Sequence, residues 1–156
     1  MTRRLLVILL MLVAVSGCEA SWFSKNTTVI KVDPAVIKEV RSLGRIVART
    51  TADPIYERTV QVVEILVLDV GPSNFAEALS VARRRLEQHG WSVGSNTDVT
   101  VIMTSSRWNG TTARLGRLED IDALGAKLGP EVEKALQADS EKSSAYVVAS
   151  LSAVEE

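Results

Sequence analysis

A twelve-residue run of mostly β-branched and aliphatic residues, Thr59–Val70, constrains the fold more than any other segment of this chain. Residues of this kind favour β-strands. The alternation of polar and apolar residues shifts phase at Val62 and Val63, which predicts either a β-bulge or a strand buried on both faces at the centre of a sheet. A sheet built around this strand is therefore expected.

The strand is followed by the clearest amphipathic helix of the chain. Gly71–Asn74 breaks the strand, and Asn74 with Glu77 three residues later has the pattern of a capping box. Apolar residues then recur at helical spacing, at Phe75, Ala78, Leu79, Ala82 and Leu86. Gly90 ends the helix in a left-handed conformation, and Trp91 after it is predicted to lie in the core.

Further helices and strands are predicted before and after this strand–helix pair. After it we expect two strands around the hairpin signal Asn109-Gly110, then a helix and a last strand, at residues 99–104, 111–115, 121–137 and 144–151. Gly129-Pro130 is expected to kink or split the helix. Before it, Asp33-Pro34 and Gly44 bound an extra N-terminal helix.

The order of the main elements, β-α-β-β-α-β, predicts an α+β fold of the ferredoxin-like, split βαβ type. Two helices would pack on one face of a four-stranded antiparallel sheet, with the extra N-terminal helix added. Right-handed crossovers place the strands that begin near Thr59 and Thr111 in the centre of the sheet. A chain of 156 residues has room for one such domain, which we assign to residues 33–156.

Residues 1–18 have the organisation of an export signal. A basic segment, Thr2-Arg3-Arg4, is followed by the apolar run Leu5–Val15 and then by Ser16-Gly17-Cys18. The eleven apolar residues extend only about 16 Å as a helix, short of the roughly 30 Å hydrocarbon core of a bilayer. We interpret the run as the core of a signal peptide, with a buried N-terminal helix as the alternative. Arg3-Arg4 leaves the twin-arginine route open beside general secretion.

The segment Val15-Ser16-Gly17-Cys18 resembles the lipobox of bacterial lipoproteins, an aliphatic residue and two small residues before a cysteine. The resemblance implies removal of residues 1–17 and a diacylglyceryl group on the Cys18 thiol, leaving residues 18–32 as lipidated N-terminus and tether. Acyl chains such as palmitate would anchor the protein on the extracytoplasmic side of the cell membrane. Twelve of the eighteen basic residues are arginine, and the chain is similar in style to small lipoproteins of actinobacteria.

Composition argues against several other classes of function. Eighteen basic and nineteen acidic residues give a formal net charge of −1, so nucleic acid is not expected as a partner. Cys18 and His89 are the only cysteine and histidine, and they cannot build a Cys/His zinc site unless both take part. We expect no metal and no other cofactor. His89 follows the amphipathic helix, where a capping or surface role is favoured over catalysis.

These observations favour a non-catalytic binding domain. If both helices cover one face of the sheet, the other face is open to an envelope protein or a cell-wall component. The polar strand residues expected to line it are Thr59, Gln61, Thr100, Thr104, Thr112 and Arg114. The candidate binding residues are Arg114 and Trp108, which lies beside the hairpin tip and is expected to be the most exposed aromatic residue. The membrane is a second partner, through the lipid on Cys18.

The alternative is a small extracytoplasmic hydrolase with an anion-binding loop at residues 71–75. This loop lies between a strand and a helix, where free N–H groups can hold an anion. Together with Gly90-Trp91 and Asn96, it resembles acylphosphatases, which share the ferredoxin-like fold. The resemblance implies an arginine after Phe75 that clamps phosphate, but Ala76 stands there, so the hydrolase is the less favoured function.

Overall fold

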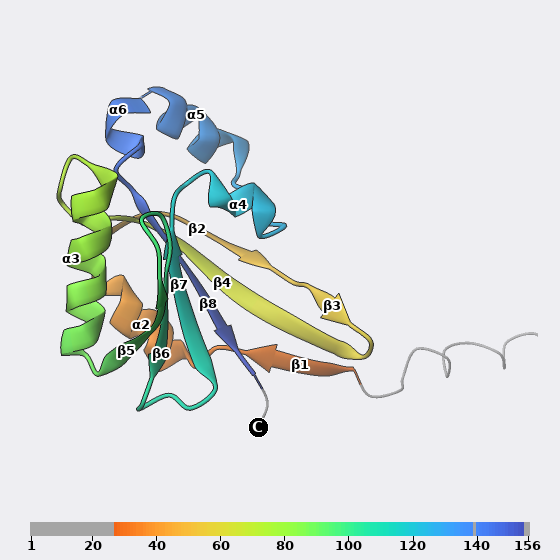
Figure 1. Cartoon of the computed structure of the whole chain (residues 1–156). Coiled ribbons are helices and arrows are strands. Elements are labelled where there is room, and N and C mark those ends of the chain that lie inside the picture. The colour runs from red at the N-terminus through yellow and green to blue at the C-terminus, as the bar shows by residue number, and fades with distance from the viewer. Residues whose placement is uncertain (1–26, 139, 155–156) are drawn as a thin grey trace, which may run out of the picture.

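The computed structural model describes residues 27–138 and 140–154, which form one mixed β-sheet with helices packed against it (Figure 1). The strands are β1 (Thr28–Lys31), β2 (Arg45–Ala52), β3 (Ile55–Tyr56), β4 (Thr59–Asp69), β5 (Trp91–Asn96), β6 (Val101–Ser105), β7 (Thr111–Gly116) and β8 (Val147–Ala153). The helices are α2 (Pro34–Arg41), α3 (Phe75–Gln88), α4 (Asp120–Ala123), α5 (Pro130–Ala138) and α6 (Ser140–Ser143). The signal peptide and Cys18 lie outside the described residues.

Strand β4 is the centre of the sheet. Residues 64–68 pair with β8 along one edge, and residues 63–69 pair with β2 along the other, both antiparallel. From β8 the sheet continues through β7 and β6 to β5, again antiparallel throughout. Among the described strands, only β1 is parallel to its neighbour, residues 59–62 of β4.

The predicted ferredoxin-like, four-stranded antiparallel sheet is wrong, because this α+β fold has an eight-stranded mixed sheet. The strands that begin at Thr59 and Thr111 are not neighbours, since β8 lies between them and pairs with both. The residues of β8 from 147 to 151 are all buried, as a strand covered on both faces requires. The other edge of β4 is taken by β2, which the sequence pattern did not predict.

One face of the sheet packs against α2 and α3. The side chain of Asn74 caps α3 by accepting a hydrogen bond from the N–H of Glu77 at 2.9 Å, and the five predicted apolar positions of this helix are buried. Trp91 is 2% exposed, as predicted, and its Nε1 donates to Glu39 of α2 at 2.6 Å. Asp33 caps α2 as the sequence indicates. Both of these helices are therefore confirmed.

The opposite face of the sheet is covered by α4, α5 and the segment between them. Leu66 and Leu68 of β4 belong to the core under α2 and α3, whereas Ile65 and Val67 belong to the core under α4 and α5. The helix predicted at 121–137 is split, with Gly125 in the left-handed region at φ 71° after α4. The expectation that both main helices share one face is wrong, because β4 and β8 are apolar on both sides.

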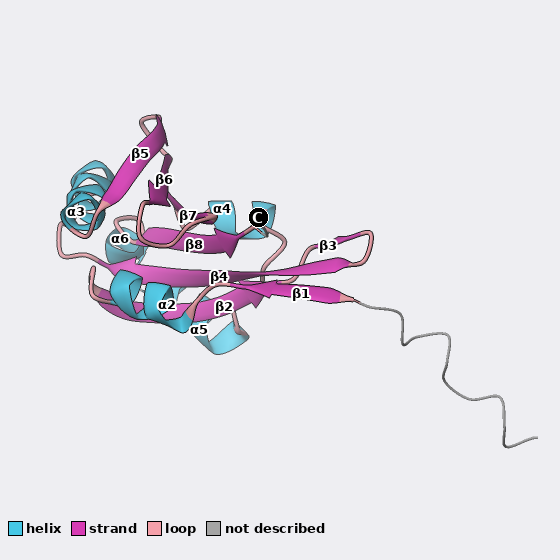
Figure 2. Cartoon of the chain, turned by 90° about the horizontal axis from the view of Figure 1, so that it is seen from below, coloured by secondary structure: helices cyan, strands magenta, loops and turns pink. Residues whose placement is uncertain are grey.

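The first half of β4 extends beyond the rest of the sheet, as Figure 1 and Figure 2 show. It pairs there with β1 on one edge and with β3 on the other. We call this extension the arm and define it as β1, β3 and residues 59–62 of β4. Residues 28–31, which fall in the segment predicted to be a tether, are thus a strand of the folded body.

The face of α3 that packs on the sheet can be tested by two substitutions. Leu86 is fully buried and Arg84 is exposed. Leu86→Ala is expected to lower the free energy of unfolding by about 2–5 kcal/mol, because it removes buried methyl groups and leaves a cavity. Arg84→Ala is the matched control and should change it by less than about 0.5 kcal/mol. Equal effects of the two in urea unfolding would contradict this packing.

Candidate functional site

Helices α4 and α5 leave the β5–β7 part of their sheet face uncovered. Strand β6 shows this most clearly, because Val101 and Met103 are buried whereas Ile102 and Thr104 are exposed. The strand register places cross-strand partners of these exposed residues on the same side. We call this surface the open face and define it by Ser92, Ile102, Thr104, Thr112 and Arg114. Its side chains are mostly hydroxyl-bearing, with one apolar residue and one cation.

Arg114 lies on the open face and is half-buried. Its guanidinium lies 3.8 Å from a carboxylate oxygen of Asp120 in α4. The same oxygen accepts a hydrogen bond from the N–H of Arg117 at 3.1 Å, which fixes the carboxylate at the edge of the open face. The positive charge of Arg114 is therefore partly balanced, and the open face as a whole is close to neutral.

Trp108 does not join Arg114 on the open face. Its half-buried ring packs against the core under α2 and α3, on the other side of the sheet. Within the described residues its Nε1 is buried and has no hydrogen-bond partner, while the guanidinium of Arg107 lies 4.8 Å from the ring centroid. The expectation that Trp108 is the most exposed aromatic residue is wrong, because Tyr56 is 66% exposed.

The loop at residues 71–75 already holds an anionic group of the protein itself. The carboxylate of Asp69 accepts a hydrogen bond from the N–H of Gly71 at 3.2 Å and forms ion pairs with Arg45 at 2.8 Å and Lys142 at 3.3 Å. The hydrogen bond from Arg45 is the main cause that holds the pKa of Asp69 below its usual range, and the interaction raises the pKa of Arg45. An external anion would compete with Asp69 for these donors.

Other parts of the acylphosphatase-like pattern lie apart from this loop. A hollow of about 340 Å³ beside the loop is lined by Gly71, Pro72, Ser73, Glu141 and Lys142. Asn96 lines a different hollow of about 350 Å³, together with Ala76 and Arg83 of α3. Arg83 forms an ion pair with Glu87 at 3.1 Å on its own helix. The structure therefore does not bring the loop and Asn96 into one site.

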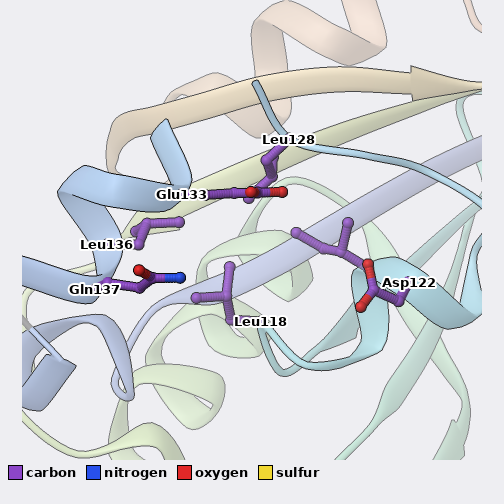
Figure 3. Close-up of a pocket in the computed structure, with 7 residues that line it drawn as sticks. Leu118, Asp122, Leu128, Glu133, Leu136 and Gln137 are labelled. Carbon is purple, nitrogen blue, oxygen red and sulfur yellow. The ribbon is translucent and has the colours of Figure 1, made fainter. Parts of the chain in front are cut away.

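A third hollow lies between α4 and α5 and was not predicted from the sequence. It has a volume of about 190 Å³, below the range of roughly 300–1,000 Å³ that is usual for small-molecule pockets. Figure 3 shows the residues that line it: Leu118, Ile121, Asp122, Leu128, Glu133, Leu136 and Gln137. The only sequence signal for this hollow is the spacing of its four apolar residues, which lie on both sides of the helix-breaking residues Gly125 and Gly129.

The described residues offer no group of three or more His, Cys, Asp and Glu side chains that could hold a metal ion. His89 is exposed at the end of α3, where its backbone N–H donates a hydrogen bond to the backbone carbonyl of Leu86 at 2.9 Å. Within residues 27–138 and 140–154, no helix is long and apolar enough to cross a membrane. The chain matches no protein-family model, no curated protein and no solved structure.

The ion pairs of Asp69 predict a pH-dependent contribution to stability. Because its pKa is lowered on folding, this contribution is fully present above the ordinary aspartate value of about 3.9 and is lost as the pH falls through the lowered pKa. Asp69→Asn should therefore reduce the free energy of unfolding by about 1 kcal/mol near neutral pH, with the difference disappearing in acid. Urea unfolding curves recorded across this pH range measure the effect.

The control for Asp69→Asn is Asp98→Asn, which changes an exposed carboxylate in the turn between β5 and β6. It should leave the free energy of unfolding within about 0.5 kcal/mol of the parent protein at every pH. If the free energy of unfolding of Asp69→Asn differs from that of the parent protein by the same amount at every pH, including strongly acidic pH, the ion pairs of Asp69 are not the cause of the destabilisation.

Proposed function

We propose that this chain is a lipid-anchored lipoprotein on the extracytoplasmic side of the cell membrane. In this proposal the thiol of Cys18 carries the lipid, and the folded body is a non-catalytic domain that binds an envelope protein or a cell-wall component. The open face is the observation that supports the binding function, because it is sheet surface that no helix within residues 27–138 and 140–154 covers. The lipid anchor rests on the lipobox-like segment that ends at Cys18.

The chemistry of the open face suits recognition of a neutral polar partner. Hydroxyl groups of Thr104 and Thr112 can donate and accept hydrogen bonds. Ile102, which is 36% exposed and lies two residues before Thr104 on β6, adds an apolar contact beside them. The Arg114–Asp120 pair offers one donor group at the border of the face. These groups favour a flat contact with a protein or a cell-wall polymer over a deep pocket for a small substrate.

A hydrolase centred on the loop at 71–75 is the less supported function. The donors that an anionic substrate would need, the N–H of Gly71 and the side chains of Arg45 and Lys142, are engaged by Asp69. Glu141 also lines the hollow beside this loop and would repel an anion.

The lipid anchor is tested by Cys18→Ser. Serine has no thiol for diacylglyceryl transfer, so this variant should incorporate no radioactive palmitate and should accumulate as the uncut precursor. The unchanged chain expressed in the same cells is the control. Normal acyl labelling of Cys18→Ser would show that the lipobox-like segment is not used.

Binding at the open face is tested by photo-crosslinking in intact cells. A photo-reactive side chain at Thr104 is expected to give a discrete crosslinked product, since this position is exposed in the middle of the open face. The control position is Gln88, which is also exposed but lies at the end of α3. If both positions give the same products or neither gives one, the open face is not the binding surface.

A further inference from the structure

The arm ends in a group of exposed apolar side chains, and two of them, Ile55 and Tyr56, are the most exposed large apolar residues that the structure describes. Ile55 is 71% exposed and Tyr56 is 66% exposed, and Val29 on β1 is 51% exposed. Val29 and Ile55 both align with Val60 of β4, so these apolar side chains form a row across one face of the arm. Tyr56 aligns with Thr59 and lies on the other face, so exposed apolar surface is present on both sides of the arm.

The tip of the arm is also the place where the chain leads toward Cys18. The N–H of Thr28, the first residue of β1, donates to the carbonyl of Arg58 at 2.9 Å, in the turn that joins β3 to β4. Nine residues lie between Cys18 and Thr28, and the ten residue-to-residue steps span at most about 35 Å. If Cys18 carries the lipid, the tip cannot lie farther than this from the bilayer surface.

We propose that the tip of the arm, formed by Val29, Ile55, Tyr56 and Arg58, docks on the lipid bilayer that holds the anchor. This inference rests on the lipid anchor proposed above and adds a second contact with the membrane. Tyrosine is enriched at the headgroup level of membranes, where the ring is shielded from water and the hydroxyl remains hydrated. Moving exposed aliphatic side chains from water into the bilayer lowers the free energy of the system, which favours docking.

Charge and strand length favour the bilayer over other occupants of the tip. Arg58 is exposed in the tip turn and Lys31 is exposed at the other end of β1, and basic residues near an apolar surface are attracted to anionic headgroups. Glu57, the acidic residue of the same turn, is also exposed and offsets part of this positive charge. A second copy of the chain is not favoured, because β3 has two residues and β1 has four, too short to template strand pairing between molecules.

The test uses the full-length acylated protein in vesicles of phosphatidylethanolamine and phosphatidylglycerol. Since the thiol of Cys18 is blocked by its lipid, Tyr56→Cys supplies a single free thiol for a fluorescent label. The label at position 56 should be quenched by spin-labelled lipids and protected from an aqueous quencher. Gln88→Cys is the matched control, because Figure 1 shows α3 at the end of the sheet away from the arm, and a label there should show the reverse.

Adding Ile55→Asp to the labelled protein separates docking from simple nearness to the membrane. A carboxylate in place of an aliphatic side chain that inserts into the bilayer should raise the water-exposed population of the label about tenfold or more. Lys134→Asp, at an exposed position of α5, is the control and should leave the quenching unchanged.

The possible failures are distinguishable. If the acylated protein does not float with the vesicles, the proposed lipid anchor fails. If it floats but the label at position 56 stays accessible to the aqueous quencher, the anchor stands and the docking proposal is overturned. Protection that appears only after envelope proteins are added, or label-to-label contact between copies, also overturns it by identifying a protein occupant.

Discussion

Residues 65–68 of β4 are enclosed on four sides, by β2 and β8 along the two edges and by an apolar core on each face. The neighbouring strands satisfy the backbone N–H and C=O groups of this segment, which therefore lose no hydrogen bonds on burial. Its alternating side chains supply both cores, with Leu66 and Leu68 under α2 and α3 and Ile65 and Val67 under α4 and α5. Neither helical layer has a surface to pack on unless this strand is in place.

The local elements around β4 could be predicted because their signals are short-range. The cap at Asn74, the apolar stripe of α3 and the left-handed Gly90, at φ 86°, all act within a few residues of one another. The phase shift at Val62 and Val63 is explained by burial on both faces at the second half of β4. The register irregularity lies in its partner β2, between Ile46 and Ala48.

The strand order was not predictable from these signals. An apolar run shows that a segment is a strand, but it does not show which strands lie beside it. Strand β2 was missed because Arg45 and Arg49 interrupt its apolar pattern, and their partners, Asp69 and Glu64, are on the neighbouring strand and far away in sequence. Strand β5 was missed because Gly94 and several polar residues give it little β-strand character, as its exposed position at the sheet edge permits.

In the candidate site, too, the features set by short-range sequence patterns were predictable, and those set by long-range contacts were not. The polar residues of β6 and β7 were predicted from alternation to face away from the core, and Thr104 and Arg114 do so. The pairing of Arg114 with Asp120 was not predictable, since it depends on how the chain turns from β7 into α4. Trp108 was misjudged because hairpin tips are usually exposed, whereas this loop folds its indole back onto the core under α2 and α3.

The parallel pairing of β1 with β4 also determines how the body resists mechanical load. A tether that holds Thr28 and is pulled along the strand direction stretches the four registered positions of β1 together, in shear. A pull across the strands would instead load the same hydrogen bonds one at a time, so that they break in sequence from one end of β1. If the lipid on Cys18 proposed above holds the body, the body resists force along the axis of the arm better than force across the strands, and β1 would detach before the enclosed part of β4.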